Sequence, residues 1–434
     1  MKKYSFPRGG FLYDDPAAPA KTDAVIAFLP AISIIPLGNY PSGRVYPLVS
    51  IGDMVKEGML IGRASGAGAV NVHAPVPGRV IRKVSWKDGE GSDCDALVIR
   101  MEGAFEKLGK KEDIFPWNGL NSYDLQRLIS DFGIIEMEKS GRPLADLISE
   151  YRRENEKLTL VVSCVFDDPW LAADYALCQE RYKAVAEGSL IAAHACSKVS
   201  RIIFAVSHHE KKLGGQLLAE TGNWKIPSSL VLTGSRYPQR NNRELNLALR
   251  SYEKKEGLDL GSFLILGPAV LAAVHDAVKF KKPILDRYVA VGGSALKRPQ
   301  VLKVRIGTRI GELFEQCGGF IEKPSRIVMG SPLLGRRVKY LDEPVVKNCY
   351  AVAAMSKSQT SFHSRQNCIN CGECRAVCPV GLDPQNIYKQ ITMMDIDKTG
   401  TTGCHGCGCC KIVCPSSLPL SDVILYENPE AAYA

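Results

Sequence analysis

Two cysteine runs near the C-terminus constrain this chain more than any other feature of its sequence. Each run has the spacing C-x2-C-x2-C-x3-C-P; the first ends in Cys378-Pro379 and the second in Cys414-Pro415. Three thiols two residues apart can wrap one inorganic group in a tight turn, while the fourth lies about a helical turn further on and faces a neighbouring group. The proline ends the loop and starts the next element. The duplicated spacing therefore predicts two adjacent metal-containing groups that exchange their fourth ligands.

This spacing is the ligand pattern of two-cluster [4Fe–4S] ferredoxins. The predicted ligands of the first cluster are Cys368, Cys371, Cys374 and Cys414. The predicted ligands of the second cluster are Cys404, Cys407, Cys410 and Cys378. A pair of structural zinc sites is the alternative, but zinc takes its four ligands as two short pairs, which fits a duplicated eight-cysteine pattern poorly. Two adjacent clusters indicate one-electron transfer.

Seven further cysteines are scattered along the chain, which indicates reduced thiols in a cytosolic compartment and not a disulfide framework. One of them, Cys409, lies between the ligands Cys407 and Cys410. It is either a spare, partly buried thiol or a redox-active or alternative ligand, and its role stays open. His405, beside Cys404, is expected on a solvent-facing loop, although a hydrogen bond from it to a cluster sulfur would raise the cluster potential.

Composition excludes several classes of protein. A chain of 434 residues has room for three or four domains. The net charge is +9 with no basic run interleaved with aromatics, so we expect no nucleic-acid binding; a mildly basic surface suits an acidic redox partner or an anionic membrane face. The most apolar stretch, 25–37, is too short to span a bilayer and contains two prolines, and the N-terminus has no hydrophobic signal core. We therefore expect a cytoplasmic protein without a transmembrane segment, at most peripheral on the inner membrane face.

The rest of the chain divides by its hydrophobic patterns. Residues 1–105 show short strands broken by glycine and proline, like the barrel-sandwich hybrid of biotinyl and lipoyl carriers, but the hairpin tip at 64–69 lacks the carrier lysine, so we expect a structural domain. Residues 120–282 predict a three-layer α/β domain with a largely parallel sheet, and 283–325 predict a small β-grasp module. A linker is expected over about 323–360, and residues 355–420 hold the ferredoxin-like module.

Individual elements of the α/β domain follow from the same patterns. The strands are expected at 158–165, 201–206, 229–233 and 263–266. The helices are expected at 123–131, 169–196, 210–221, 242–254 and 268–280.

This domain order resembles the RnfC family over essentially the whole chain. The resemblance is carried by G-D-M-V-K-E-G at 52–58, H-A-P-V-P-G at 73–78, G-G-S-A-L-K-R-P at 292–299, I-G-T at 306–308, C-G-G at 317–319 and both cysteine runs. It implies an RnfC-type barrel-sandwich hybrid, a Rossmann-like α/β domain resembling that of the complex I flavoprotein subunit, a β-grasp module of the SLBB type and a dicluster ferredoxin module. RnfC is the peripheral, NADH-facing subunit of the ion-pumping Rnf complex. Cobalamin reductase PduS and the proline-reductase-associated electron-transfer protein PrdC look like relatives.

The flavin loop of the family is degenerate here. RnfC-like dehydrogenases carry G-x-G-G-A-G-F-P, whose glycines let the backbone approach the flavin while a helix N-terminus holds phosphate. The matching stretch, 136–143, places Glu136, Glu138 and Lys139 in this loop and keeps Gly141 and a proline. Side chains then fill the flavin space, and two carboxylates repel a phosphate more strongly than one lysine attracts it.

Two further family segments are also altered. A segment resembling N-G-V-E-C-E-P has Phe166 in place of its first glutamate and Asp168 at the second. A segment resembling Y-P-Q-G-G-E has Arg240 and two asparagines in place of its glycines and acid. The Asp167-Asp168-Pro169 stretch is most simply a helix cap and first turn. We therefore expect a closed or repurposed pocket, no binding of FMN or NADH, and no catalytic residues.

Three functions remain open at this stage. The first is an iron–sulfur protein that relays electrons from a flavoprotein, a ferredoxin or an Rnf-type membrane complex to a terminal reductase, with proline reductase as one concrete acceptor. The second is an enzyme, an FMN-dependent NADH dehydrogenase subunit of an ion-translocating complex. The third is a structural adaptor that docks a membrane complex. The altered pocket favours the first over a stand-alone dehydrogenase.

Overall fold

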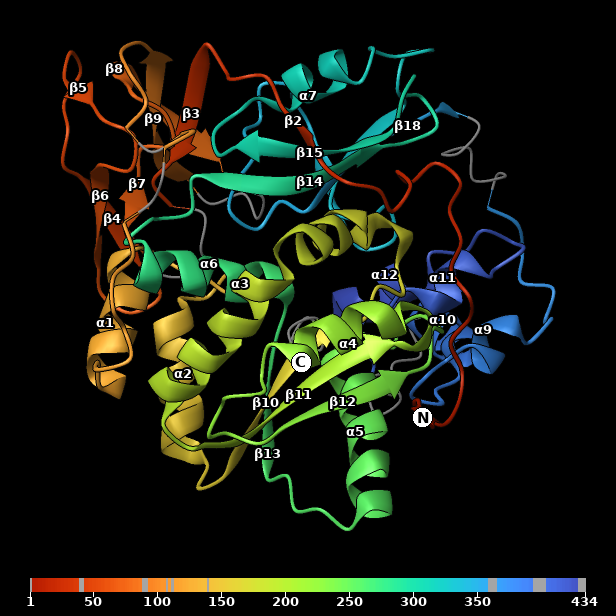
Figure 1. Ribbon diagram of the computed structural model, residues 1–434. Coiled ribbons are helices and arrows are strands. Elements are labelled where there is room, and N and C mark those ends of the chain that lie inside the picture. The colour runs from red at the N-terminus through yellow and green to blue at the C-terminus, as the bar shows by residue number, and fades with distance from the viewer. Residues whose placement is uncertain are drawn as a thin grey trace.

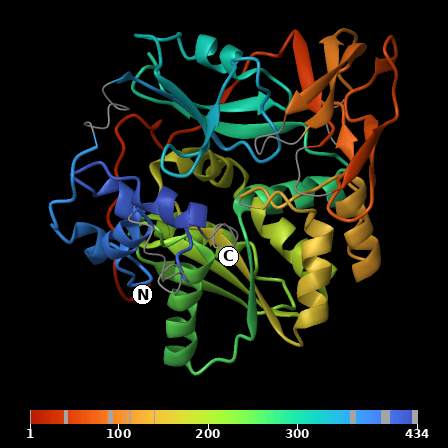
Figure 2. The ribbon, with the colours of Figure 1, turned by 180° about the vertical axis from the view of Figure 1, so that it is seen from behind.

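The structure, a computed structural model, describes residues 2–38, 43–87, 93–106, 108–110, 113–138, 140–357, 365–392 and 403–427. Figure 1 shows a parallel α/β body below, two β-rich units above it, and a small helical module at one side. The view from behind in Figure 2 shows the same arrangement, with the N-terminal segment beside the helical module in both views. Among the described residues, no helix combines the length and the hydropathy needed to span a bilayer.

The first β-rich unit consists of two antiparallel sheets that enclose one core. The four-stranded sheet has the order β3-β9-β8-β5, and its strands are β3 (Ile32–Pro36), β5 (Met54–Val55), β8 (Gly78–Lys87) and β9 (Asp93–Met101). The three-stranded sheet has the order β4-β6-β7, and its strands are β4 (Arg44–Pro47), β6 (Leu60–Ser65) and β7 (Val72–His73). Ile35, Ile61 and Leu97 are among the buried side chains shared between them. The β6–β7 turn corresponds to the expected hairpin tip, and the backbone N–H of Gly68 there donates to Asp146 at 3.3 Å.

The α/β body is built on a sheet of five parallel strands in the order β1-β12-β11-β10-β13. The strands are β1 (Lys3–Tyr4), β10 (Leu158–Cys164), β11 (Val199–Ser207), β12 (Ser228–Thr233) and β13 (Ser262–Leu266). Every residue of β10 is buried, as expected for a central parallel strand covered on both faces. The edge strand β1 comes from the extreme N-terminus, which sequence patterns had assigned to the first β-rich unit.

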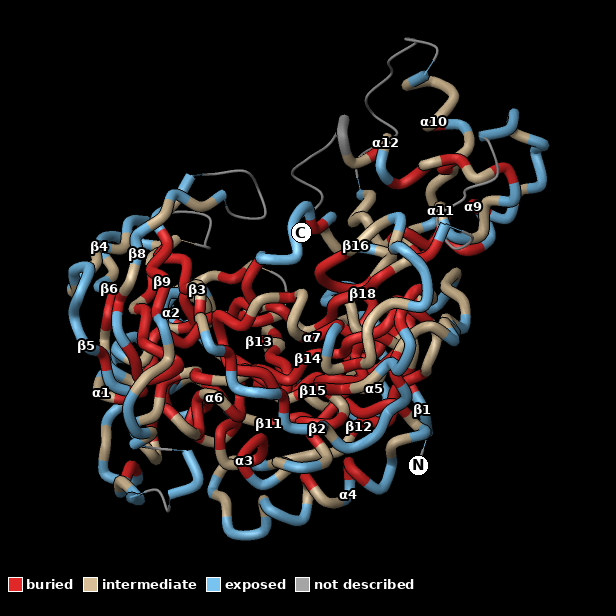
Figure 3. The backbone as a smooth tube through the Cα atoms, turned by 90° about the horizontal axis from the view of Figure 1, so that it is seen from above, coloured by how far each residue is buried: buried red, intermediate tan, exposed pale blue. Residues whose placement is uncertain are grey.

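Helices cover both faces of this sheet. Val161 and Ile203 share a core with α5 (Asn242–Glu256), whereas Leu160 and Phe204 share the larger core with α3 (Ala172–Cys196), α4 (Lys211–Ala219) and α6 (Pro268–Lys279). The larger core also takes α1 (Ser122–Asp131) and α2 (Leu144–Glu154), and short 3-10 turns lie at Pro169–Leu171 and His208–Glu210. Figure 3 shows this buried interior, with exposed residues mainly at its margins. The helix α2 was not expected from the sequence, although Leu144, Leu147, Ile148 and Tyr151 have helical spacing.

The second β-rich unit is a mixed six-stranded sheet in the order β17-β16-β18-β14-β15-β2. Its strands are β2 (Val25–Ile26), β14 (Asp286–Gly292), β15 (Gln300–Arg305), β16 (Arg326–Met329), β17 (Arg336–Val338) and β18 (Ala351–Met355), and α7 (Ile310–Gln316) packs on it. The expected linker over 323–360 was therefore wrong, because β18 is an interior strand of this sheet. The run of small apolar residues that forms β18 was the signal for it.

The helical module contains α9 (Glu373–Ala376), α10 (Pro384–Thr392), α11 (Cys409–Ile412) and α12 (Leu420–Glu427). It projects from the rest of the molecule in the view of Figure 3. Its hydrophobic residues form a small group of their own, which includes Leu418 and Leu420 beside several cysteines.

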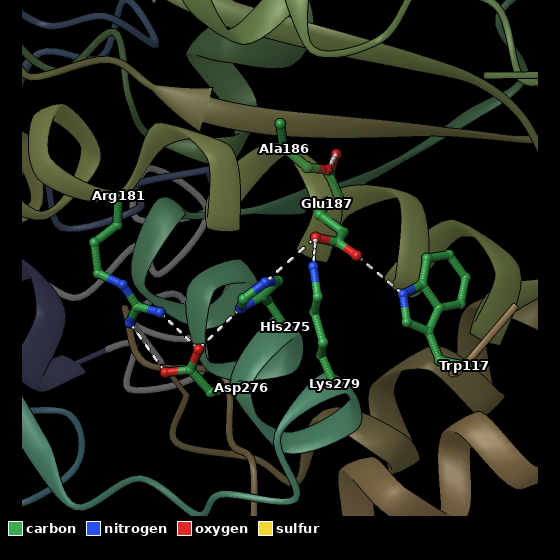
Figure 4. Close-up of polar contacts among 8 residues, drawn as sticks. Trp117, Arg181, Ala186, Glu187, His275, Asp276 and Lys279 are labelled. Carbon is green, nitrogen blue, oxygen red and sulfur yellow. Dashed lines mark hydrogen bonds and ion pairs between the residues drawn. The ribbon is translucent and has the colours of Figure 1, made fainter. Parts of the chain in front are cut away.

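A chain of charged side chains ties α3 to α6, and Figure 4 shows how they face one another. Arg181 donates two hydrogen bonds to Asp276, at 2.6 and 3.0 Å. His275 lies 2.9 Å from Asp276 through Nδ1 and 3.4 Å from Glu187 through Nε2. Glu187 also accepts from Lys279 at 2.5 Å and from the indole of Trp117 at 3.1 Å. These contacts join the two helices over more than one turn of each.

This charged chain sets protonation states. Burial opposes the imidazolium, but hydrogen bonds to Asp276 and Glu187 outweigh it and raise the pKa of His275. The hydrogen bond from His275 lowers the pKa of Glu187 to about 2. Burial alone would raise the pKa of Asp276, but hydrogen bonds from His275 and Arg181 outweigh it and lower this pKa to about 2. His275 therefore links two carboxylates through its two ring nitrogens.

We predict that His275 makes stability depend on pH. Its folded-state pKa lies above the unfolded value, so its contribution is complete below about pH 6.5 and is lost as the pH rises through the raised value. His275→Gln should lower the melting temperature more at pH 6 than at pH 9. Thermal unfolding of both proteins at the two pH values measures this, with exposed His209→Gln as the matched control. An equal loss at both values would contradict it.

Candidate iron–sulfur centre and the cleft beside it

The two cysteine runs adopt the same local geometry. In each, the residue after the second cysteine is a glycine with a left-handed backbone, Gly372 at φ 79° and Gly408 at φ 76°. Each glycine precedes a four-residue helix that carries the third cysteine and brings the fourth about one turn further. Residues other than glycine rarely adopt this conformation. The repeated glycine therefore lets each loop fold back around the space between its cysteines.

The four predicted ligands of the second cluster surround one pocket. Cys378, Cys404, Cys407 and Cys410 all line it, together with apolar residues that include Pro379, Leu382 and Ile424. The backbone N–H of Leu382 donates to the Cys378 thiol at 3.3 Å. Backbone N–H groups near cysteine sulfurs stabilise the negative charge that a cluster brings. The pocket thus combines the four predicted ligands and a fifth thiol, that of Cys409, with an apolar wall.

The predicted ligands of the first cluster are placed less compactly. Cys374 is buried and shares a hydrophobic group with Cys368 and Cys414, whereas Cys371 is exposed. Cys410 belongs to the same group, so the two cysteine sets adjoin. Among the described residues, no three His, Cys, Asp or Glu side chains gather in a way that could hold a single metal ion. The structure thus brings Cys368, Cys374 and Cys414 together next to Cys410, one of the cysteines that line the pocket, and thiols are the usual ligands of iron–sulfur clusters.

His405 corrects one expectation about the second run. Its side chain is only 10% exposed, and its Nε2 lies 3.0 Å from the fully buried carboxylate of Glu244 in α5. Burial would lower the pKa of His405, but the hydrogen bond to Glu244 and the charge of that carboxylate raise it. The solvent-facing position expected for His405 is therefore wrong: it fastens the loop beside Cys404 to the α/β body.

Cys409 is completely buried, and it packs with Tyr237 and Val377 where the module meets the α/β body. The partly buried thiol expected from the sequence is thus more enclosed than predicted. Sequence spacing could not place it, because its neighbours come from distant parts of the chain.

The three altered family segments converge in the α/β body at Arg240. Its guanidinium Nη2 lies 2.8 Å from Glu138 and 2.9 Å from Asp174, and its backbone N–H donates to Asp167 at 3.0 Å. The side chains are almost enclosed, with exposures of 12% for Arg240, 15% for Glu138 and 2% for Asp174. Arg240 therefore occupies the meeting point of all three segments with a buried ion-pair network.

Glu136 binds the backbone of its own loop. One carboxylate oxygen accepts from the backbone N–H of Glu138 at 2.7 Å, and the other accepts from the backbone N–H of Ser140 at 2.6 Å and from its hydroxyl at 3.1 Å. Gly141 keeps a left-handed backbone at φ 62°. Lys139 lies outside the described residues. Two N–H groups that could face a phosphate are thus directed to a carboxylate of the chain itself.

Glu138 fills a second possible anion position. A Cβ built on Gly267, the residue that caps the N-terminus of α6, would lie 1.0 Å from the Glu138 carboxylate oxygen. A helix N-terminus attracts negative charge, so this carboxylate occupies the place where an external anion would bind.

The two aspartates beside this network serve local structure. Asp168 accepts from the backbone N–H of Trp170 at 2.9 Å, which confirms the predicted cap of the 3-10 turn. Burial raises the pKa of Asp167 to about 7 and that of Asp168 to about 6. The Phe166 ring packs edge-on against Tyr175 at 5.5 Å between centroids. Asp167, Asp168 and Phe166 thus make local contacts within the chain.

Comparisons with known proteins show what parts of this chain are similar to. Three family models match it: an RnfC barrel sandwich hybrid domain over 6–104, an SLBB domain over 288–336, and a 4Fe-4S dicluster domain over 361–415. The chain is 29% identical over 380 residues to a subunit of an ion-translocating oxidoreductase complex of Rhodobacter capsulatus, covering 86% of this chain and 72% of that protein. It is 26% identical over 381 residues to a subunit of a proton-translocating ferredoxin:NAD(+) oxidoreductase complex of Clostridium ljungdahlii, covering 87% and 82%.

A solved structure with a related shape is an NAD+-reducing [NiFe]-hydrogenase in its H2-reduced state. The likeness has a TM-score of 0.49 at 13% sequence identity, and it covers 64% of this chain and only 54% of that one.

We predict that Arg240 holds the cleft together. Arg240→Met would leave Glu138 without its cation and would leave Asp174 with only the more distant Arg287, at 3.7 Å. Breaking a buried pair costs about 3–5 kcal/mol. Denaturant unfolding measures the loss, which Glu138→Gln in the same chain should partly reverse. Arg127→Met is the matched control. Arg127 is 71% exposed and its partner Asp131 is 56% exposed, and such surface pairs contribute under about 1 kcal/mol. Equal losses in Arg240→Met and Arg127→Met would contradict the prediction.

Proposed function

The chain is a member of an RnfC-like family, and from that premise we propose that it relays single electrons through two [4Fe–4S] clusters without a flavin of its own. The observation that carries the proposal is the pocket lined by all four predicted ligands of the second cluster, next to the cysteines predicted to bind the first. Cys368, Cys371, Cys374 and Cys414 would hold the first cluster, and Cys404, Cys407, Cys410 and Cys378 the second. The clusters supply one-electron transfer when bound.

The exposure of the two cysteine sets indicates which cluster would face a redox partner. Cys371, a proposed ligand of the first cluster, is exposed, and Ile369 beside it is 64% exposed. The second set faces the α/β body through His405 and Glu244. The first cluster would therefore exchange electrons with a redox protein outside the chain, such as a flavoprotein, a ferredoxin or a reductase.

Relatives support a place within a larger redox assembly. The two named above are subunits of an ion-translocating oxidoreductase complex and of a ferredoxin:NAD(+) oxidoreductase complex. We infer that this chain occupies the corresponding peripheral position, on the cytoplasmic face of a membrane complex of the Rnf type. Delivery of electrons to a terminal reductase such as proline reductase is a finer form of the same proposal.

We also propose that the parallel α/β domain, 120–282, is Rossmann-like and that the module at 283–325 is a β-grasp. Five parallel strands with helices on both faces support the first assignment, and strands β14 and β15 with the packed helix α7 support the second. The barrel-sandwich hybrid at 1–105 and the dicluster domain at 355–420 complete the division.

The cleft opposes flavin chemistry in this chain. Glu136 takes up the loop N–H groups, Glu138 covers the N-terminus of α6, and Arg240 pairs with Glu138. An FMN phosphate would have to displace both carboxylates and leave Arg240 partly unpaired, which costs several kcal/mol. The competing function, an FMN-dependent NADH dehydrogenase, requires this site to open.

The proposal predicts the cluster content of the protein. Anaerobically prepared protein should contain about eight iron and eight sulfide per chain, as two cubanes require. Cys378→Ala should disturb the cluster of Cys404, Cys407 and Cys410, whose pocket it shares, and leave the signal of the other cluster unchanged. Cys349→Ala is the control, because Cys349 is buried in the core of the second β-rich unit. Stoichiometric zinc, or loss of the first cluster in Cys378→Ala, would contradict the ligand assignment.

The proposal also predicts that the protein contains little flavin. Protein denatured to release its cofactors should yield far less than one FMN per chain by fluorescence, and added FMN should bind no tighter than in the millimolar range. Replacing Glu136 and Glu138 together by glycine should strengthen FMN binding, because the variant frees two loop N–H groups and the helix N-terminus. Stoichiometric flavin in the wild-type protein would instead support the dehydrogenase.

A further inference from the structure

The two proposed clusters are held very differently. In the described part of the chain, the hydrogen bonds at the ligands of the first cluster stay within the module, as between the Cys368 thiol and Asn370. The loops of the second cluster are instead bonded to the α/β body and to the N-terminal segment at three separate places. The anchored loops carry Cys378, Cys404 and Cys407.

The first anchor is the N-terminal segment 6–13, which we call the strap. Gly10 donates its backbone N–H to the carbonyl of Val377 at 2.8 Å, directly before Cys378. The strap packs so closely there that a Cβ on Gly9 would lie 2.6 Å from the backbone carbonyl of Cys378. The guanidinium of Arg8 covers Gly381, where a Cβ would lie 2.3 Å from Nη1. Figures 1 and 2 both show this segment running alongside the module.

The strap is itself fixed to the α/β body. Arg236 donates to the carbonyls of Gly9 at 2.7 Å and Phe6 at 2.8 Å. Phe11 and Tyr237 exchange two backbone hydrogen bonds, at 2.8 and 3.1 Å. The strand β1, which directly precedes the strap in the sequence, also pairs with β12. The strap therefore has little freedom to move, and the α/β body sets the position of Cys378.

The second and third anchors reach the other two loops. The hydroxyl of Tyr237 donates to the carbonyl of Cys407 at 2.8 Å, and Tyr237 is 4% exposed. The contact between His405 and Glu244 holds the residue next to Cys404. The ring of Tyr237 packs with Phe11 and Tyr13, each at 5.8 Å between centroids, against the buried thiol of Cys409.

We propose that the N-terminal strap and Tyr237 are positioning elements for the second cluster, which fix its ligand loops and set its potential independently of the first cluster. This assignment rests on the proposed function, since it requires that clusters bind. The O–H dipole of Tyr237 points its positive end at the loop of Cys407, and a positive dipole near a cluster stabilises the reduced form. The first cluster receives no such contact from the strap or Tyr237 in the described residues.

Tyr237→Phe tests the assignment without a change of packing. It removes one hydrogen bond and keeps the ring. The reduction potential of the second cluster should fall, whereas that of the first cluster should stay as in the wild type. Redox titrations monitored by EPR measure both potentials, and the variants Cys404→Ser and Cys368→Ser assign each signal to its cluster. Tyr13→Phe is the control, because its ring belongs to the same aromatic group but its hydroxyl lies beside Ser331 and not at the module.

Gly9→Ala tests the strap. The added methyl group meets backbone at 2.6 Å, so Cys378 must shift, and the second cluster should be lost or altered first. Iron content should then fall toward about four per chain with the first cluster's signal retained. Gly257→Ala is the control, since its φ of 62° matches the 66° of Gly9 but nothing lies within 4 Å of its Cβ.

The outcomes distinguish the positioning role from the proposed function. Unchanged potentials in Tyr237→Phe together with an intact second cluster in Gly9→Ala would overturn the positioning role. Equal changes at both clusters would also overturn it, because the contacts would then act on the module as a whole. Wild-type protein that binds no clusters would contradict the proposed function itself, and this assignment with it.

Discussion

A guanidinium buried in the α/β body is the constraint on which the rest of the structure depends. Removing a charge from water costs several kcal/mol unless it is paired, so Arg240 requires the carboxylates of Glu138 and Asp174. Pairing with Glu138 draws the 136–143 loop against α6, and the backbone contact with Asp167 fixes the end of β10. One arginine thus joins three segments that are far apart in the sequence. The nearly buried side chains of Glu138, Asp174 and Arg240 lie between these segments.

The same end of the sheet supports the module. Tyr237, three residues before Arg240, bonds to the loop of Cys407, and Glu244 in the first turn of α5 bonds to His405. The segment that closes the cleft therefore continues directly into the segment that holds the second cysteine set. The position of the cysteine loops therefore depends on the fold of 237–244 and on the strap.

Much of the fold could be predicted because the signals were local. The central strands and the five expected helices of the α/β body lie within a few residues of their predicted bounds, since buried parallel strands and amphipathic helices have distinct periods. The two cysteine sets were predicted from spacing alone, and the structure brings Cys378, Cys404, Cys407 and Cys410 to one pocket. What could not be predicted was non-local: the pairing of β1 with β12, of β2 with β15, and the bond between His405 and Glu244. The helix α2 and the strand β18 were missed although their residues have helical spacing and strand-like apolar character, respectively. The stretch before α2 was interpreted as a degenerate flavin loop, and the stretch that contains β18 was interpreted as a linker.

The central claim, that electrons reach the clusters from a partner protein and not from NADH through a flavin in the chain, is tested most directly by anaerobic EPR of the purified holoprotein. The protein is mixed with NADH alone or with dithionite-reduced ferredoxin and frozen after seconds to minutes. We predict signals of reduced clusters with ferredoxin and none with NADH. Rapid appearance of the same signals with NADH alone would contradict this claim, because the cleft closed by Glu136, Glu138 and Arg240 would then have to admit both a flavin and a nicotinamide.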